Sequence, residues 1–155
     1  DTWSAYRPED EGVLVAYASI YGNTAGAAKK MAELLKEKGA KKVALTDLAR
    51  DDMAEAIEDA FRYDKMVLAC STYDGGIFPC MEDFLSHLKA KNYQKRTVAL
   101  IENGTWAPMS GKKMREILES MKDVKVLENT VTIRSAVKEE TIDALNNLAD
   151  ELINE

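Results

Sequence analysis

The sequence predicts an α/β protein in which parallel strands form one sheet and helices cover both of its faces. Short apolar runs alternate with segments of helical periodicity from Val13 onward. The first run, VLVAYAS, is continuously apolar, which is typical of a strand buried on both faces. Because a helical segment separates each run from the next, the strands are expected to be parallel and joined by right-handed crossovers.

Each expected strand is an apolar run, and the five runs are VLVAYAS, KVALTDL, KMVLACS, RTVALIE and VKVLENTVTIRS. They occupy residues 13–19, 42–48, 65–71, 96–102 and 124–135. Polar residues Glu128 and Asn129 interrupt the last run, so we expect this strand to bend there.

Each expected helix carries helical spacing or a helix-start signal, at residues 24–38, 51–63, 79–91, 110–122 and 138–153. Gly39 supplies a C-terminal stop for the first helix, and acidic residues open the second. Pro79 suits the first turn of the third helix. The last helix is amphipathic over its length.

Length, charge and composition exclude several classes of function. The chain has 155 residues and a formal net charge of −6, which fits one domain with a sizeable core and disfavours nucleic-acid binding. No apolar run approaches the ~18 residues that span a membrane, so we expect no membrane partner. The two cysteines make no disulfide framework, so we expect a protein of the reducing cytoplasm. Cys70, Cys80 and the single His87 match neither a redox CxxC pair nor a metal site, so no metal ligands are expected.

The opening residues differ from the rest of the chain. DTWSAYRPEDEG is polar and rich in turn-forming residues, yet it carries Trp3 and Tyr6. We interpret residues 1–12 as a linker or arm from a preceding domain, and residues 13–155 as one domain.

Ligands of such sheets bind beyond the carboxyl ends of the strands, where the strand order reverses. The loop after the first strand is SIYGNT, residues 19–24. Gly22 permits a tight turn, and Asn23 or Thr24 can cap the following helix, so backbone N–H groups and the helix dipole suit a phosphate. The loop matches neither GxGxxG nor GxxxxGK[ST], and the alternative interpretation is a plain, well-capped turn.

The loops after the third and fourth strands suit a flat ligand. STYDGGIFP contains Gly75 and Gly76, which let backbone amides approach such a ligand closely, although a long turn with a hydrophobic anchor remains the alternative. ENGTWAP places Trp106 at the same edge, where it either covers its own core or stacks on a planar group. A phosphate at one end and a flat ring system at the other describe flavin mononucleotide (FMN).

The motifs YASIYGNT, STYDGGIFPCMEDFL and IENGTWAP carry a resemblance to a known family. From Val13 onward the chain resembles the flavodoxin-like fold, a three-layer sandwich with a five-stranded parallel sheet of order 2-1-3-4-5. More narrowly, it looks like the C-terminal flavodoxin domain of flavodiiron proteins (A-type flavoproteins), and DTWSAYRP looks like the linker before that domain. Small flavodoxins tend to have a threonine-rich phosphate loop. Here Tyr21 precedes the glycine instead, as in flavodiiron proteins and some quinone reductases.

The resemblance implies a function. In that family FMN passes electrons from a donor such as rubredoxin to a diiron site that reduces oxygen or nitric oxide. That site lies in a separate metallo-β-lactamase-like domain, usually across a dimer. This chain would then be an electron-transfer module without catalytic residues of its own and without a complete diiron site.

Carried over by position, the phosphate loop would comprise Ser19, Ile20, Tyr21, Gly22, Asn23 and Thr24. The remaining cofactor-binding positions would be Ser71, Thr72, Tyr73, Asp74, Gly75, Gly76, Ile77, Asn103, Gly104, Thr105 and Trp106.

Three alternatives stay open. A free-standing flavodoxin is disfavoured by the linker-like start. An FMN-dependent NAD(P)H:quinone reductase is disfavoured because no long insertion is present to build a nicotinamide site. A receiver-like signalling domain would need an acidic cluster that Asp47 and Asp74 do not supply convincingly.

Overall fold

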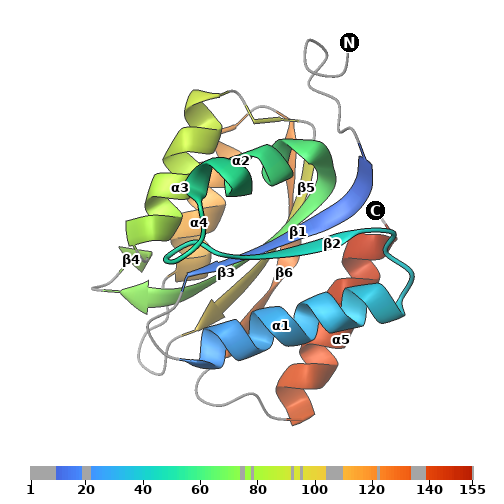
Figure 1. Ribbon diagram of the computed structural model, residues 1–155. Coiled ribbons are helices and arrows are strands. Elements are labelled where there is room, and N and C mark those ends of the chain that lie inside the picture. The colour runs from blue at the N-terminus through green and yellow to red at the C-terminus, as the bar shows by residue number, and fades with distance from the viewer. Residues whose placement is uncertain are drawn as a thin grey trace.

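The computed structural model consists of a parallel sheet between two layers of helices (Figure 1). It describes residues 10–18, 22–73, 76–77, 79–91, 93–94, 96–103, 110–121, 123–133 and 139–154. The strands are β1 (Asp10–Ala18), β2 (Val43–Asp47), β3 (Tyr63–Tyr73), β4 (Gly76–Ile77), β5 (Arg96–Asn103) and β6 (Val124–Ile133). The helices are α1 (Gly22–Glu37), α2 (Met53–Arg62), α3 (Pro79–Ala90), α4 (Ser110–Glu119) and α5 (Glu139–Ile153).

The strand order confirms the predicted topology. The main path through the sheet is β2-β1-β3-β5-β6, and every neighbouring pair on it is parallel. Counted without the two-residue β4, which pairs antiparallel with β3, this is the predicted order 2-1-3-4-5. The chain moves outward from β1 to β2 and then returns past β1 to β3, so the order reverses at β1 and β3.

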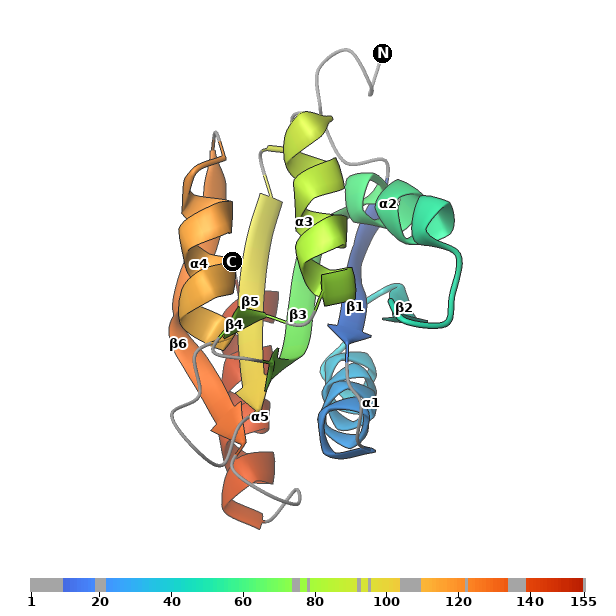
Figure 2. The same ribbon diagram turned by 90° about the vertical axis from the view of Figure 1, so that its left-hand side faces the viewer.

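The two helix layers bury opposite faces of the same strands. Figures 1 and 2 show α1 and α5 on one side of the sheet and α2, α3 and α4 on the other. In β1, Leu14 and Ala16 pack in the core beneath the second group, whereas Val13 and Val15 pack beneath α1 and α5. All four are at most 2% exposed, which explains why the sequence of this strand is continuously apolar.

The first strand begins at Asp10, three residues before the predicted start at residue 13. The register of β1 against β3 shifts between Asp10 and Val13, and the Gly12 N–H donates to Asp64 Oδ1 at 3.0 Å. A Cβ at Gly12 would lie 2.8 Å from both the Lys42 carbonyl oxygen and Tyr63 Cδ1. Glycine is therefore required where the chain enters the sheet.

The last strand is irregular near Glu128 and Asn129, where the sequence predicts a bend. Between Val98 and Leu100 of β5, the partner residues in β6 advance from Val126 to Thr130, so β6 carries extra residues there. The guanidinium of Arg115 on α4 binds this irregular segment. Its Nη2 donates to Leu127 O at 2.6 Å and to Thr130 Oγ1 at 3.0 Å.

No helix among the described residues has the length and apolar character that crossing a membrane requires.

A buried arginine joins α2 to the sheet at the amino ends of the strands. Arg96 is 3% exposed, and its guanidinium donates to the carbonyl oxygens of Phe61, Tyr63 and Gln94 at 2.6, 3.0 and 2.7 Å. It also lies 5.6 Å from the centroid of the Tyr93 ring, which packs edge-on against Phe61. Burial lowers the pKa of Arg96, but an arginine remains charged throughout the physiological range.

We expect Arg96→Ala to lower the free energy of unfolding by about 3 kcal/mol or more, because charge-assisted hydrogen bonds to buried carbonyls are lost. Arg96→Lys should lower the free energy of unfolding by less, since the lysine ammonium can keep some of these hydrogen bonds. Urea denaturation measures both changes. The highly exposed Arg50 is the control, because Arg50→Ala should change stability by less than about 0.5 kcal/mol. An Arg96→Ala variant as stable as this control would contradict the structural role.

Candidate functional site

The carboxyl ends of three strands meet at one edge of the sheet. Ala18, the last residue of β1, pairs with Cys70, and Ser71 of β3 pairs with Asn103, the last residue of β5. The chain segments that follow β1, β3 and β5 therefore start side by side. This edge is also where the strand order reverses, which is the usual ligand position in open α/β sheets.

Only part of the predicted cofactor site lies within the described residues. The structure gives the backbone of Gly22, Asn23, Thr24, Ser71, Thr72, Tyr73, Gly76, Ile77 and Asn103. Outside the described residues lie Ser19, Ile20, Tyr21, Asp74, Gly75, Gly104, Thr105 and Trp106. The described members come together at the carboxyl edge, and the binding role of each residue stays a prediction.

The N-terminus of α1 lies at this edge and suits an anion. The helix begins at Gly22, four residues after the end of β1, and its first turn contains no acidic side chain. The positive end of its dipole is therefore not offset by a carboxylate of the same turn. Thr24 in that turn is completely buried, which fixes the turn against the core.

The second predicted loop contains a small hairpin that the sequence interpretation missed. Thr72 pairs with Ile77 and Tyr73 with Gly76 in antiparallel fashion, so β3 and β4 are separated by two residues. Those residues are Asp-Gly in the sequence, which is one of the dipeptides favoured in two-residue hairpin connections. The segment was expected to be a single loop, but its described parts are strand, and the Asp-Gly signal could have predicted them.

A further residue of this edge, Glu102 near the end of β5, was not predicted as a site residue. Its Oε1 accepts a hydrogen bond from the Gly111 N–H at 3.0 Å, and its Oε2 accepts one from Thr132 Oγ1 at 2.8 Å. Glu102 thereby joins β5 to the first turn of α4 and to β6. No local pattern reveals this, since the partners lie nine and thirty residues away in the sequence.

Other titratable residues near this edge take structural positions. Cys80 in the first turn of α3 is partly buried, and burial raises the pKa of its thiol, which keeps it protonated. Asp47 accepts a hydrogen bond from the Ala49 N–H at 3.0 Å, and its own N–H donates to Asp51 at 2.8 Å. Asp52 caps α2 through the Ala54 N–H at 2.9 Å. The acidic residues after β2 therefore build a turn.

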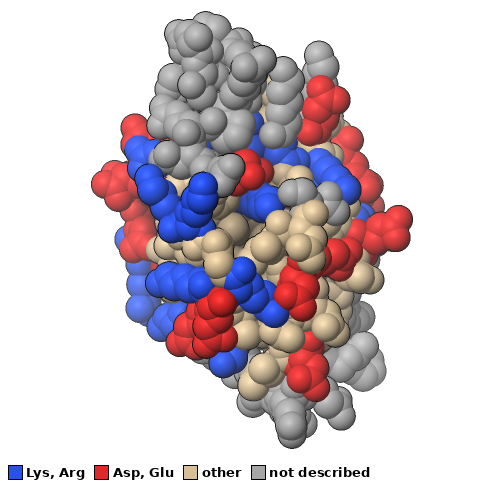
Figure 3. Space-filling model, turned by 90° about the vertical axis from the view of Figure 1, so that its right-hand side faces the viewer, with Lys and Arg blue, Asp and Glu red and all other residues tan. Residues whose placement is uncertain are grey.

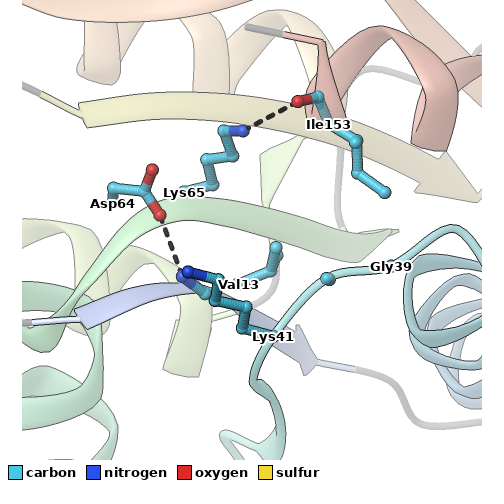
Figure 4. Close-up of a pocket in the computed structure, with 8 residues that line it drawn as sticks. Val13, Gly39, Lys41, Asp64, Lys65 and Ile153 are labelled. Atoms are coloured by element: carbon cyan, nitrogen blue, oxygen red, sulfur yellow. Dashed lines mark hydrogen bonds between the residues drawn. The ribbon is translucent and has the colours of Figure 1, made fainter.

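A cavity of about 320 Å³ lies at the opposite, amino edge of the sheet (Figure 4). Lys41, Asp64 and Lys65 line it, and Lys65 Nζ donates to Ile153 O at the end of α5 at 3.1 Å. Lysine and arginine side chains gather on the face that includes this edge (Figure 3). Because α1 and α5 both end here, their negative dipole ends and Asp64 oppose an anion, and the lysines offset those charges.

A groove of about 670 Å³ runs between α2 and α3. Met53, Ile57 and Phe61 give it an apolar floor, with Glu58, His87 and Lys91 also lining it. Neither this groove nor the amino-edge cavity combines a helix N-terminus with the carboxyl ends of strands. The carboxyl edge remains the candidate site.

Solved structures show the same fold. Rubredoxin:oxygen oxidoreductase from Desulfovibrio gigas matches 98% of this chain with a TM-score of 0.91 and 18% sequence identity, and the match covers 37% of that protein. A flavodiiron protein variant from Thermotoga maritima matches 99% of the chain with a TM-score of 0.82 and 24% identity, over 38% of its length. A flavodoxin from the domain Archaea matches 92% of the chain with a TM-score of 0.79 and 17% identity, over 96% of its length.

The chain thus spans less than two fifths of the two larger proteins and nearly all of the archaeal flavodoxin. A comparison with curated proteins finds no match in sequence. The family model of the flavodoxin domain matches residues 14–143, which is most of the chain and includes all three loops of the candidate site. The chain therefore belongs to the flavodoxin domain family.

Proposed function

We propose that the carboxyl edge of the sheet binds FMN and that the chain is an electron-transfer domain. The observation that carries this proposal is the meeting of the ends of β1, β3 and β5 beside the N-terminus of α1, whose first turn has no acidic residue. A dianionic phosphate fits such a helix start. FMN, when bound, accepts and donates electrons, while the protein supplies binding and orientation.

The phosphate end of the proposed site is the segment 19–24. There, backbone N–H groups and the hydroxyls of Ser19 and Thr24 would hold the phosphate, with no lysine or arginine in the segment. The ring end is formed by the β3–β4 hairpin and the segment after β5. Ser71 through Ile77 would line the edge of the ring system, Asn103 through Thr105 would contribute to the same end of the site, and Trp106 would cover one face of the ring.

We further propose that the chain is the C-terminal module of a flavodiiron oxygen or nitric-oxide reductase. Support comes from the match of 98% of the chain to part of the Desulfovibrio gigas oxidoreductase. Its partners would be a diiron metallo-β-lactamase-like domain in the same polypeptide, reached across a dimer, and rubredoxin or a related reductase as the donor. A free-standing flavodoxin is the second candidate, favoured by the match that covers 96% of the archaeal flavodoxin.

The FMN site predicts a difference between two flavins. Flavin-free protein should bind FMN tightly and riboflavin at least about tenfold more weakly, because riboflavin lacks the phosphate that the start of α1 binds. Titration followed by flavin fluorescence measures both affinities. Equal affinities for the two flavins would contradict the phosphate site and support a site for the ring system alone. If the folded chain bound neither flavin, the proposed function would be contradicted.

Thr24 supplies a matched variant for the same titration. Thr24→Val keeps the shape of the buried side chain but removes its hydroxyl, so the affinity for FMN should fall about tenfold while that for riboflavin is unchanged. Thr24→Ser, which retains a hydroxyl, is the control. Equal loss for both flavins would show that this position does not act at the phosphate.

The flavodiiron assignment is tested by the coding frame upstream of Asp1. A domain rich in histidine and carboxylate metal ligands in that frame would support the module. An initiator codon shortly before Asp1 would instead favour the free-standing flavodoxin, and it would leave the FMN proposal intact.

A further inference from the structure

Glu102 occupies a position that joins three elements around the candidate site. It is the second-to-last residue of β5, and it pairs with Cys70 on the neighbouring strand β3, directly before Ser71. Its two carboxylate oxygens accept separate hydrogen bonds, one from the first turn of α4 and one from the side chain of Thr132 on β6. A single side chain therefore connects β5, α4 and β6 at the carboxyl edge.

The start of α4 depends on this carboxylate. The first turn of α4 contains no acidic residue of its own, so Glu102 supplies the negative charge that stabilises a helix N-terminus. The approach is close, because a Cβ on Gly111 would lie 3.0 Å from both Cδ and Oε1 of Glu102. Glycine at this position lets the helix start lie directly against the carboxylate.

The same helix packs against the hairpin of the ring end. Residues of α4 contact β4, which pairs with the end of β3. The position of the start of α4 therefore affects this hairpin, which belongs to the ring end of the proposed FMN site. The phosphate end of that site lies at the start of α1.

We propose that Glu102 is a positioning residue for the ring end of the flavin site: its two hydrogen bonds fix the start of α4 and the end of β6 against β5. This inference rests on the proposed FMN binding. A residue that acts only at the ring end affects FMN and riboflavin equally, because the two flavins share the ring system. Glutamine can replace Glu102 in both bonds, since its amide oxygen accepts from Gly111 and its amide N–H donates to the Thr132 hydroxyl.

The test compares Glu102→Ala, Glu102→Gln and wild type by titration with FMN and with riboflavin. Glu102→Ala should weaken both flavins by the same factor, about tenfold, through the loss of two hydrogen bonds to the site scaffold. Glu102→Gln should retain both affinities to within about threefold.

Arg115→Ala is the matched control for destabilisation. It removes the bonds from the middle of α4 to the irregular segment of β6, while Glu102 still holds the start of α4, so it should lower thermal stability with little change in flavin affinity. The positioning role would be overturned if Glu102→Ala lowered only the thermal stability, or if it weakened the binding of FMN but not that of riboflavin. It would also be overturned if Glu102→Gln bound the two flavins as weakly as Glu102→Ala does. Failure of the wild type to bind either flavin would overturn the proposed function, and this role with it.

Discussion

The parallel pairing of β1 with β2 on one side and β3 on the other is the constraint on which the rest of the structure depends. It places β1 inside the sheet, where the two helix layers bury both of its faces, so the side chains of β1 serve packing and chemistry is confined to the ends of the strand. It also makes the chain reverse its course through the sheet after β2. The reversal leaves the carboxyl ends of β1 and β3 adjacent, with a helix leading away from β1 on one face and from β3 on the other.

The two edges of the sheet are stabilised differently. At the amino edge, helices end, and positively charged side chains bind their terminal carbonyls: Arg96 binds Phe61 O near the end of α2, and Lys65 binds Ile153 O at the end of α5. At the carboxyl edge, helices begin, and the described residues include a carboxylate at the start of α4 but no acidic residue in the first turn of α1. This difference between the starts of α4 and α1 supports the proposal that an anionic cofactor binds beside α1.

The sequence was sufficient to predict the five strands of the main sheet and the five helices, because apolar runs alternate with helical segments that have a clear start or stop. Even the irregularity of β6 follows from Glu128 and Asn129, which interrupt its apolar run. The start of β1 at Asp10 was not predictable, since it depends on a close approach of Gly12 to Lys42 and Tyr63 that no local pattern contains. Asp-Gly before Gly76 did contain a hairpin signal, but the adjacent glycines favoured the interpretation of a loop that lies against a flat ligand, or of a long turn.

The candidate site was predictable in its location but not in its supporting residues. The three loops could be found because they follow three expected strands, whereas Glu102 has its role only through Gly111 and Thr132, which the fold brings to it. Motifs identify the residues that surround a ligand more readily than those that hold the surrounding elements in place. The latter depend on tertiary contacts between side chains and backbone that are far apart in the sequence.

The most direct test of the central claim is to map FMN binding by the amide ¹H–¹⁵N chemical shifts of the flavin-free protein. The account predicts that the largest changes occur at the carboxyl edge, at the amides of Gly22 to Thr24, Ser71 to Tyr73, Gly76 and Asn103. Amides of Gly12, Gly39 and Lys65 around the amino-edge cavity should change little. Changes centred on that cavity, or on Met53, Ile57 and His87 between α2 and α3, would contradict the account.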